Sequence, residues 1–370
     1  MKKVLYVLNN MNIGGTEKAF LNLVDTMSPE EYDLTLMLLE KDGGFLAFVP
    51  EWVHIENIKN HEKVKKEILD PPLQIAKSYM KKGKFIDSVG LLLTHIWSKI
   101  TGNRTLYYRW VLRKSNLLEY YDEAVAYCGP FDLLTVYVLY FVNAKRKIQW
   151  IHFDVSKFSF NLELAKRLYP RFDQIKVVSD EARMKLVKAI PSIKNITRTS
   201  FNVVSEKKCV ELSLLGSGFQ DSFQGIRIVT VGRLSQEKGQ DIIPNVASLI
   251  SQKCDDFCWY LIGEGNLKSK IEKEIEQYGV KEKVVFLGVQ VNPYPFLKDT
   301  DLYVQTSLHE GYCITLAEAR AFKLPIVSTA CAGAHDQLDG RPHSLIVERQ
   351  AEQIAEAIIK LLIETGKVKV

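Results

Sequence analysis

Residues 292–322 read NPYPFLKDTDLYVQTSLHEGYCITLAEARAF and contain a strand, a tight polar turn and the start of a helix. The apolar run at 302–304 predicts that the strand is buried. In the turn, Gly311 is available for backbone angles that other residues rarely adopt. Thr315 and Glu318 then have the spacing of a capping box, so we expect a helix with Thr315 as its N-cap.

Two carboxylates, Glu310 and Glu318, flank this turn. A strand end that leads into a helix N-terminus presents free amide groups and the positive end of the helix dipole, which suits a phosphate. Because carboxylates do not bind phosphate, the two acids would hold hydroxyl groups, as a sugar or a ribose requires. Taken alone, the turn is equally compatible with a plain cap at Glu318 and a solvated loop acid at Glu310.

Strands and helices alternate along the whole chain, which predicts an α/β protein with doubly wound sheets. Residues 4–8 are typical of a buried parallel strand, and the pair Gly14-Gly15 precedes a helix at 16–27. This order is typical of a nucleotide-binding start, but the full glycine fingerprint is absent and a plain tight turn explains the pair equally well. Further strands are expected at 34–39, 123–127, 148–151, 175–178, 226–231, 259–262, 284–287 and 326–328, and further helices at 206–215, 241–254 and 351–363.

The length of the chain favours two domains. Its 370 residues exceed one ordinary core, and 46% hydrophobic with 25% charged residues is the composition of a soluble globular protein. The pattern loosens before Gly225, where glycine, serine and polar residues gather. We therefore predict an N-terminal domain at 1–205, a linker at 206–225 and a C-terminal domain at 226–370.

The sequence also bears on the compartment. No apolar run approaches the roughly eighteen residues of a membrane-spanning helix, and the apolar start ends at Asn9, which favours an opening strand over a signal peptide. The six cysteines are scattered, and the close pair Cys254 and Cys258 has no partner at metal-binding spacing, which favours reduced thiols. A cytoplasmic protein is expected.

Residues 59–118 combine positive charge with aromatic side chains. The segment holds thirteen Lys and Arg residues against four acids, which is +9 in a chain whose total is +5. A basic helix that carries aromatic residues such as Trp97 is typical of contact with an anionic membrane surface, here the inner face of the cell membrane. The alternative is a helical insertion packed on the N-terminal domain with a solvated lysine face. Nucleic acid is not expected as a partner, because no recognition motif accompanies the charge.

Polar side chains follow two of the predicted strands. His152 and Asp154 come directly after the strand at 148–151, and the carboxyl ends of parallel strands are where ligands bind in such folds. A structural role for a lone histidine is the alternative. Arg233 and Lys238 follow another strand, and these cations would face a nucleoside diphosphate bound at the helix N-terminus described above. For this second pair the alternative is surface ion pairs with the neighbouring acids Glu237 and Asp241.

Four motifs in the C-terminal half carry a family resemblance. They are VGRLSQEKGQD at 231–241, LIGEG at 261–265, VVFLG at 284–288, and Glu310 with Glu318 after it. With these motifs in order, the chain resembles the family-4 (GT4) retaining glycosyltransferases of the GT-B fold, of the type that builds bacterial envelope and capsular polysaccharides. The resemblance is continuous from about residue 227 to 347, and in the N-terminal half it is present only in outline.

The resemblance implies two Rossmann-like domains that face each other across a cleft, with the sugar nucleotide held mainly by the C-terminal one. It implies that Arg233 and Lys238 hold the diphosphate. Glu310 would contact the donor sugar and Glu318 the ribose. The implied donor-binding residues are Gly15, Arg233, Lys238, Gly263, Val289, Glu310, Gly311, Cys313, Ile314, Thr315 and Glu318; the implied catalytic residues are Glu310, Arg233, Lys238 and His152, with His152 and Asp154 on the acceptor side.

No cofactor and no metal ion are expected. Fixed cations aimed at a departing diphosphate stabilise the charge that develops there, which makes a metal unnecessary. Asp299-Thr300-Asp301 resembles the metal-binding DxD of the other glycosyltransferase fold, but it lies between a helix end and a buried strand and is interpreted as structural.

The predicted function is retaining transfer of a hexose or N-acetylhexosamine from a nucleotide sugar, with UDP as the favoured carrier, to a lipid-linked or envelope glycan acceptor. Two alternatives stay open. One is an inactive GT-B-like subunit that stabilises a partner glycosyltransferase or binds glycan, and the other is a sugar-nucleotide epimerase. The sequence does not specify the sugar, the linkage or the oligomeric state.

Overall fold

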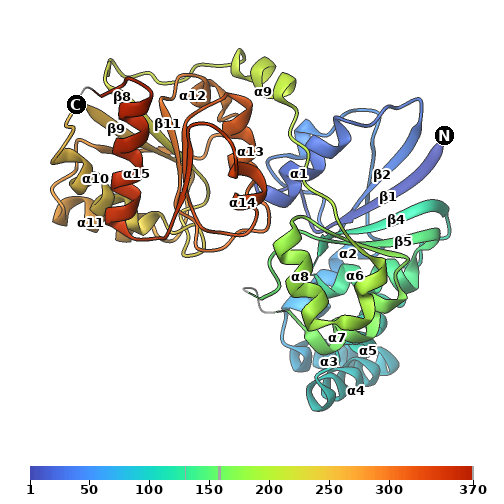
Figure 1. Ribbon diagram of the computed structural model, residues 1–370. Helices are drawn as coiled ribbons and strands as arrows, with labels where there is room; N and C mark the ends of the chain where they lie inside the picture. Colours follow the sequence, from blue (N-terminus) through green and yellow to red (C-terminus); the bar gives the residue numbers. More distant parts are fainter. Residues whose placement is uncertain (130, 157–159, 369–370) are drawn as a thin grey trace. The chain divides into compact units, whose positions relative to one another are not determined.

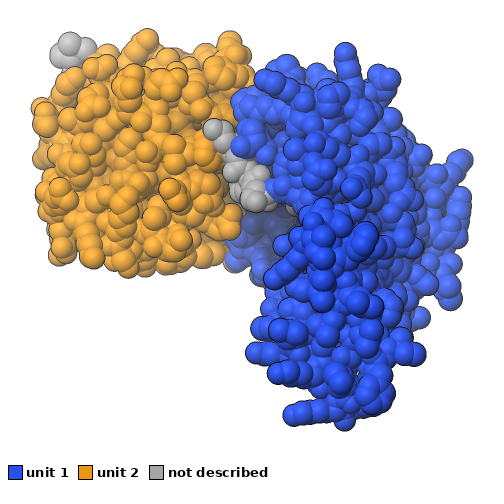
Figure 2. All heavy atoms as spheres, turned by 90° about the horizontal axis from the view of Figure 1, so that it is seen from below, with its two compact units in different colours: residues 1–201 blue, residues 202–370 orange. Residues whose placement is uncertain are grey.

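The chain forms two compact units, each with its own sheet. The computed structural model describes residues 1–129, 131–156 and 160–368. The units are Met1–Phe201 and Asn202–Val370 (Figure 2). Each contains a parallel sheet flanked by helices (Figure 1), so the predicted α/β class with two Rossmann-like domains is confirmed.

The first unit holds, within its described residues, a seven-stranded parallel sheet in the order β3-β2-β1-β4-β5-β6-β7. Its strands are β1 (Lys2–Leu8), β2 (Tyr32–Leu38), β3 (His54–Asn57), β4 (Tyr120–Gly129), β5 (Asn143–Ile151), β6 (Gln174–Val177) and β7 (Thr197–Thr199). Its helices are α1 (Gly15–Val24), α2 (His61–Leu69), α3 (Pro72–Lys81), α4 (Phe85–Thr101), α5 (Thr105–Val111), α6 (Asp132–Phe141), α7 (Leu162–Leu168) and α8 (Asp180–Ala189). The inner strands are buried on both faces, which explains their continuous apolar runs.

The second unit holds a six-stranded parallel sheet, counted over its described residues, in the order β10-β9-β8-β11-β12-β13. Its strands are β8 (Ile226–Val231), β9 (Phe257–Ile262), β10 (Val284–Gly288), β11 (Leu302–Gln305), β12 (Ile326–Thr329) and β13 (Ser344–Val347). Its helices are α9 (Glu206–Ser213), α10 (Ile243–Ser251), α11 (Lys268–Gln277), α12 (Tyr294–Lys298), α13 (Ile314–Ala321), α14 (Ala334–Leu338) and α15 (Ala351–Glu364). A core of large side chains, such as Trp259, lies between the sheet and its helices.

The segment at 206–225, predicted as a linker, is packed on the second unit. Cys209 of α9 is buried in the core of that unit. The amide of Asn292 donates to the carbonyl oxygen of Leu212 at 2.8 Å, and the hydroxyl of Tyr260 donates to Asp221 at 2.7 Å. The segment therefore differs from a free linker because both its helix and its polar run have partners within the unit.

The basic segment at 59–118 is a set of four helices, α2 to α5, attached to the first unit (Figure 1). Tyr107 of α5 is buried, and its hydroxyl donates to the carbonyl oxygen of Glu67 on α2. Part of the segment is therefore a packed helical insertion, as one of the two alternatives predicts. Among the described residues, no helix is long and apolar enough to cross a membrane.

Candidate functional site

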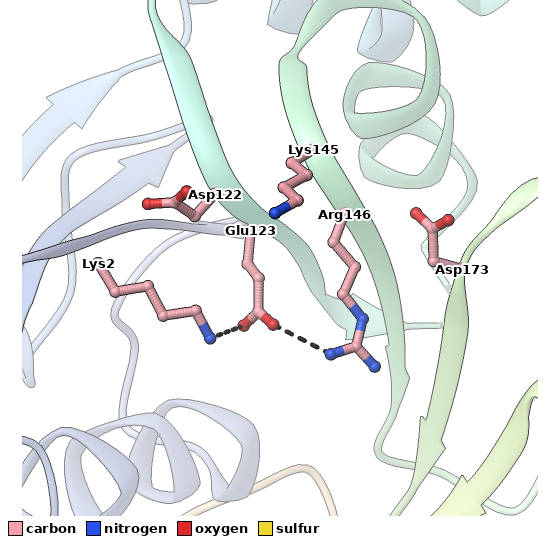
Figure 3. A pocket seen from close by; sticks show the side chains of 6 residues that line it. All are labelled: Lys2, Asp122, Glu123, Lys145, Arg146 and Asp173. Atoms are coloured by element: carbon pink, nitrogen blue, oxygen red, sulfur yellow. Dashed lines mark hydrogen bonds and ion pairs between the residues drawn. The ribbon is translucent and has the colours of Figure 1, made fainter.

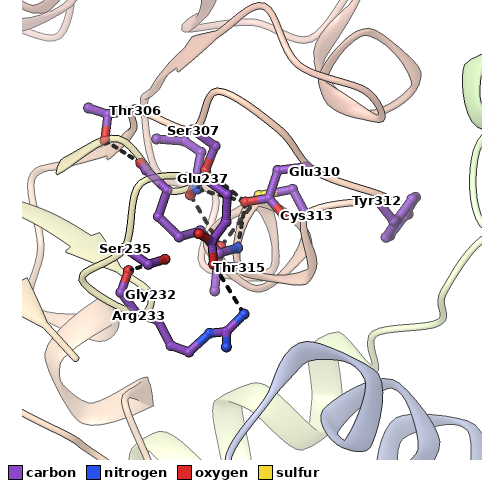
Figure 4. Close-up of polar contacts among 12 residues, drawn as sticks. Gly232, Arg233, Ser235, Glu237, Thr306, Ser307, Glu310, Tyr312, Cys313 and Thr315 are labelled. Carbon is purple, nitrogen blue, oxygen red and sulfur yellow. Dashed lines mark hydrogen bonds and ion pairs between the residues drawn. The ribbon is translucent and has the colours of Figure 1, made fainter. Parts of the chain in front are cut away.

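Two loops of the second unit meet where the order of its strands changes direction. β8 and β11 are neighbours, and the chain adds strands outward on either side of them. The loop after β8 carries Arg233 and Lys238, and the loop after β11 carries Ser307 and Glu310. Since ligands of doubly wound folds bind at such a switch point, outside the carboxyl ends of the strands, this edge of the sheet is the candidate site (Figure 4).

Lys238 and Glu310 form an ion pair at this edge. The Nζ atom of Lys238 lies 2.5 Å from Oε1 of Glu310, and both side chains are largely buried. Burial alone would lower the pKa of Lys238, but the Glu310 carboxylate more than offsets this and the pKa is raised. Lys238 therefore holds its positive charge at neutral pH inside the site.

The position of Glu310 is set by further donors. Its Oε1 atom accepts from the hydroxyl of Ser307 at 2.7 Å and from the side-chain amide of Gln305 at 3.3 Å. Gln305 itself accepts from the hydroxyls of Tyr303 at 2.7 Å and Thr315 at 3.2 Å. Gln305 and Ser307 were not among the predicted site residues. One feature of the sequence could have indicated them. Gln305 is a polar residue at the end of a buried apolar strand, and a buried polar side chain requires a hydrogen-bond partner.

The helix after the turn has a different cap from the one predicted. Cys313 is the N-cap of α13 and has a left-handed backbone, with φ at 62°. Thr315 lies inside the helix and its hydroxyl donates to Gln305, so the predicted capping box is wrong. Burial raises the pKa of the Cys313 thiol to about 12, and the nearby Glu310 carboxylate adds to this rise. Because Cys313 is close enough to Glu310 for this effect, the start of α13 lies beside the ion pair. The first amide groups of the helix, at Ile314 and Thr315, lack partners within the helix.

Glu318 lies one turn further along α13 and faces the interior of the unit. It is 3% exposed and accepts a hydrogen bond of 2.7 Å from the hydroxyl of Tyr294 on α12. Glu310, for which a solvated loop acid was the alternative, is only 9% exposed, so neither Glu310 nor Glu318 is a solvated surface acid. The burial of the Glu318 carboxylate with a hydroxyl partner is compatible with a hydroxyl ligand, such as the ribose that the resemblance implies.

Arg233 is the exposed member of the predicted cation pair. Its side chain is 68% exposed and lies 3.2 Å from Glu237, so the predicted surface ion pair exists for this residue (Figure 4). The other predicted surface pair is not formed: Asp241 pairs with Arg349 at 2.6 Å, and Lys238 pairs with Glu310. Arg233 is thus at the rim of the site, where its guanidinium can turn to an incoming anion.

Three more of the predicted donor residues lie on the same edge. Gly311 lies in the turn just before the cap of α13, and Val289 follows β10 and is 47% exposed. Gly263 follows β9 with φ at 144°, and its amide donates to the carbonyl oxygen of Gly288 at 2.8 Å. A side chain on Gly263 would overlap the backbone carbonyl of Gly232. Gly263 is therefore required for the close packing of two loops of the site.

Gly263→Ala is expected to destabilise the second unit by more than about 3 kcal/mol, because a rigid backbone carbonyl blocks the new methyl group and the positive φ adds strain. Gly279→Ala is the matched control: its φ is 67°, and a methyl group there would meet open space. That control should cost only about 1–2 kcal/mol, the strain alone. Chemical denaturation measures both variants, and equal losses would contradict the packing role of Gly263.

The first unit places its predicted residues at the carboxyl ends of its own strands. Gly15 opens α1 after β1, and a side chain on it would meet nothing within 4 Å. His152 follows β5, is buried, and has no hydrogen-bond partner for either ring nitrogen among the residues that the structure describes. Burial lowers the pKa of His152 to about 3, so the imidazole is neutral. Its ring lies against Tyr127 and Trp150, with centroids 4.4 and 5.7 Å away.

Asp154 is engaged in local contacts. It accepts from Lys185 of α8 at 2.7 Å, and from the backbone amide and the hydroxyl of Ser156 at 2.9 and 2.7 Å. Burial would raise the pKa of Asp154, but these hydrogen bonds hold it below its usual value. These contacts tie Asp154 to α8 and to Ser156, and its place on the acceptor side stays a prediction.

The DxD-like sequence lies at the opposite end of the second sheet. Asp301 precedes β11, accepts from the backbone amide of Arg227 at 2.8 Å and pairs with Lys367 at 2.6 Å. The hydroxyl of Thr300 donates to the carbonyl oxygen of Phe296. These contacts support the predicted structural role. Among the described residues, no group of three or more acids, histidines and cysteines is placed to hold a metal ion.

A hollow of about 620 Å³ in the first unit is lined by none of the predicted site residues. It lies at the amino ends of β1, β4 and β5 and is lined by Lys2, Asp122, Glu123, Lys145, Arg146 and Asp173 (Figure 3). Its central acid, Glu123, pairs with Lys2 at 3.0 Å and with Arg146 at 3.2 Å. The hollow therefore contains a paired trio of charges, Lys2, Glu123 and Arg146, and lies at the edge of the sheet opposite to the one that binds ligands in such folds.

Two Rossmann-like units define the GT-B class of glycosyltransferase folds, and solved structures of that class match nearly the whole chain. Anabaena HepE in complex with UDP-glucose matches with a TM-score of 0.70 and 16% identity, over 99% of this chain and 91% of that one. S. aureus TarM in complex with fondaparinux, alpha-GlcNAc-glycerol and UDP matches with a TM-score of 0.68 and 14% identity, over 98% of this chain and 97% of that one. At these identities the likeness shows the fold.

The model of the family "Glycosyl transferases group 1" matches residues 224–369, and the second unit is a domain of that family. The predicted resemblance is thereby confirmed. An uncharacterized glycosyltransferase of Methanocaldococcus jannaschii is 27% identical over 228 residues, 58% of this chain and 55% of its own length. The N-acetylgalactosamine-N,N'-diacetylbacillosaminyl-diphospho-undecaprenol 4-alpha-N-acetylgalactosaminyltransferase of Campylobacter jejuni is 25% identical over 216 residues, 58% of this chain and 56% of its own length. The chain thus spans about half the length of these two relatives.

Proposed function

We propose that this protein is a retaining glycosyltransferase that moves a hexose or an N-acetylhexosamine from a UDP-sugar to a lipid-linked or envelope glycan, without a metal ion. The observation that carries the proposal is the ion pair of Lys238 and Glu310 beside the start of α13. It places a charged amine, which suits a phosphate, 2.5 Å from a carboxylate, which suits sugar hydroxyls. A helix N-terminus adds amide groups for the diphosphate.

The proposed reaction breaks the bond between the anomeric carbon and the diphosphate oxygen, and the electron pair of that bond leaves with the oxygen. The acceptor hydroxyl oxygen bonds to the anomeric carbon on the same face, and its proton passes to the departing phosphate. Negative charge grows on the diphosphate as the bond breaks. Lys238, the amides of α13 and the exposed guanidinium of Arg233 are the groups that would stabilise this charge.

The two carboxylates take different substrate groups in this proposal. Glu310 would accept from hydroxyls of the donor sugar, and its donors Ser307 and Gln305 hold it in place before the substrate binds. Glu318 would accept from the ribose, sharing its carboxylate with Tyr294. Because these groups are already oriented in the free protein, little reorganisation is required when the donor binds.

The relatives support the choice of donor and acceptor. HepE is bound to UDP-glucose, and the name of the Campylobacter jejuni relative specifies a diphospho-undecaprenol acceptor. These are properties of those proteins, and they favour a UDP-sugar and a lipid-linked glycan here. We accordingly place the reaction in the cytoplasm, at the inner face of the cell membrane.

Thermal unfolding in the presence of nucleotides tests the donor. UDP and one UDP-sugar are expected to raise the melting temperature of the second unit, since a ligand at a hundred times its Kd stabilises by about 2.7 kcal/mol. GDP and GDP-sugars should have little effect. If none of these ligands raises the melting temperature, the donor site is contradicted. Conversion of the UDP-sugar into its epimer without acceptor would favour the epimerase alternative instead.

A further inference from the structure

The helices α3 and α4 of the basic segment form a hairpin, joined by the residues Lys82-Gly83-Lys84. Its inner side is packed, since Ile75 of α3 and Leu91 of α4 are buried. Figure 1 shows both helices at one end of the first unit. The hairpin is therefore held in place by its inner side, and its outer side is available for another contact.

The outer side carries a row of exposed apolar side chains. On α4 they are Phe85, Ile86, Val89, Leu93, Ile96, Trp97 and Ile100, and α3 adds Leu73 and Met80. At 100° per residue, the seven positions on α4 cover about one third of the helix circumference. Ile86 is 80% exposed and Ile100 is 77% exposed. We call these nine residues the apolar stripe; stripes of this size on a protein surface mark an interaction site.

Positive charge borders the apolar stripe. The exposed cations of α3, α4 and their neighbouring loops are Lys77, Lys81, Lys82, Lys84, Lys99 and Arg104. Between residues 71 and 111 the sequence contains one acid, Asp87. That carboxylate pairs with Arg113 and lies 3.7 Å from Lys63, so it does not neutralise the rim of the stripe.

We propose that the α3–α4 hairpin is a membrane-insertion element that lays the apolar stripe into the surface of an anionic lipid leaflet. A bilayer surface supplies both chemistries that the hairpin presents. Acyl chains would take the apolar stripe and lipid phosphates would take the lysine rim, with Trp97 at the level of the headgroups. Charge complementarity selects this occupant over a second copy of the chain, because two hairpins face to face would bring their lysines together.

This inference rests on the proposed function only for its purpose, which is to hold the protein where a lipid-linked acceptor lies. Lipid binding is measured without donor or acceptor, so its failure is distinguishable from failure of the transferase proposal. The probe is co-sedimentation with vesicles of phosphatidylglycerol and phosphatidylcholine, or of phosphatidylcholine alone, at low salt.

The full chain is expected to bind the anionic vesicles and not the neutral ones. The variant Lys81→Gln/Lys82→Gln/Lys84→Gln should bind about a hundredfold more weakly, because each of the three lysines near an anionic surface contributes about fivefold. The matched control Lys207→Gln/Lys208→Gln/Lys273→Gln removes three exposed lysines of the second unit and should bind as the parent does. Equal binding of both variants, or no binding of the parent, would overturn the proposal.

A second measurement separates insertion from surface attraction. Ile86→Ser/Ile100→Ser should weaken vesicle binding at least tenfold, whereas the control Met184→Ser, at a residue 60% exposed on α8, should not. Trp97 is 51% exposed, and the other four tryptophans are more buried. Brominated lipids should therefore quench tryptophan fluorescence of the parent and not of Trp97→Phe. Quenching that persists in Trp97→Phe, or a dimer in sedimentation that Ile86→Ser/Ile100→Ser abolishes, would overturn the membrane assignment.

Discussion

Lys238→Met is expected to lower sugar transfer about a thousandfold, because it removes the buried cation that faces the departing diphosphate. Methionine keeps the length and apolar character of the lysine stem, so the change is confined to the charge. The loss should appear mainly in kcat, since the negative charge is largest when the bond breaks. Steady-state kinetics with the UDP-sugar identified by thermal shift measure the effect.

The same substitution should also destabilise the second unit, by about 3 kcal/mol, because it leaves the largely buried carboxylate of Glu310 without its cation. Lys238→Met/Glu310→Gln should recover most of this stability, since the glutamine amide is uncharged, but it should recover no transfer. Lys298→Met, at an exposed lysine of the same unit, is the control for the loss of one charge. A folded Lys238→Met variant with more than a tenth of the parent activity would show that the site is assigned wrongly.

The pH dependence of the pair has a definite sign. The pKa of Lys238 is raised, so the stability from its charge is complete below its usual pKa, at about 10.4, and is lost as the pH rises through the higher folded value. Between pH 6 and 9 the pair should therefore contribute a constant term. This plateau makes neutral pH a suitable condition for comparing Lys238→Met with the double variant.

The inner strands and one edge strand, β10, could be predicted from the sequence, and the other three edge strands were missed. β8 begins and ends at the predicted residues, 226–231, because it is buried on both faces and reads as an apolar run. β3, β7 and β13 lie at the edges of the sheets and are partly exposed along their length. The sequences of β3 and β7 contain no apolar run that a periodicity argument could detect, whereas β13 does contain a short run at 345–347 that was missed.

The site was predictable where it depends on sequence spacing, and less so where it depends on backbone geometry. Lys238 and Glu310 were expected at one donor site, on the diphosphate and on the sugar respectively, and they lie in contact because their strands are neighbours. The N-cap was placed on Thr315 because hydroxyl residues favour that position. The structure uses Cys313 in a left-handed conformation, which is rare outside glycine and asparagine and leaves no signal in the sequence.

His152→Leu is expected to lower sugar transfer about a hundredfold while leaving the first unit at least as stable as before. The loss follows if the imidazole donates or accepts a hydrogen bond in the transition state, as the catalytic role that the family resemblance implies for it would require. The stability follows because both ring nitrogens are buried without a partner in the described part of the chain, and each such group costs about 1–3 kcal/mol. Leucine removes that cost, which offsets the ring contacts with Tyr127 and Trp150. A histidine with a purely structural role would give unchanged transfer.

The pH dependence of stability gives His152→Leu a readout that is independent of activity. Because burial lowers the pKa of His152 to about 3, its contribution is complete above pH 6.5 and is lost progressively as the pH falls from 6.5 toward 3. Between pH 7.5 and 5 the parent should therefore lose about 2 kcal/mol more than His152→Leu does in chemical denaturation of the first unit. His54→Gln, at an exposed histidine, should lose as much as the parent.

Transfer by the parent should show no ionisation of His152 between pH 5 and 9. An inflection near pH 6.5 that His152→Leu removes would mean that the imidazole titrates in the working enzyme, and a proton-transfer role would replace that of a neutral hydrogen-bonding group.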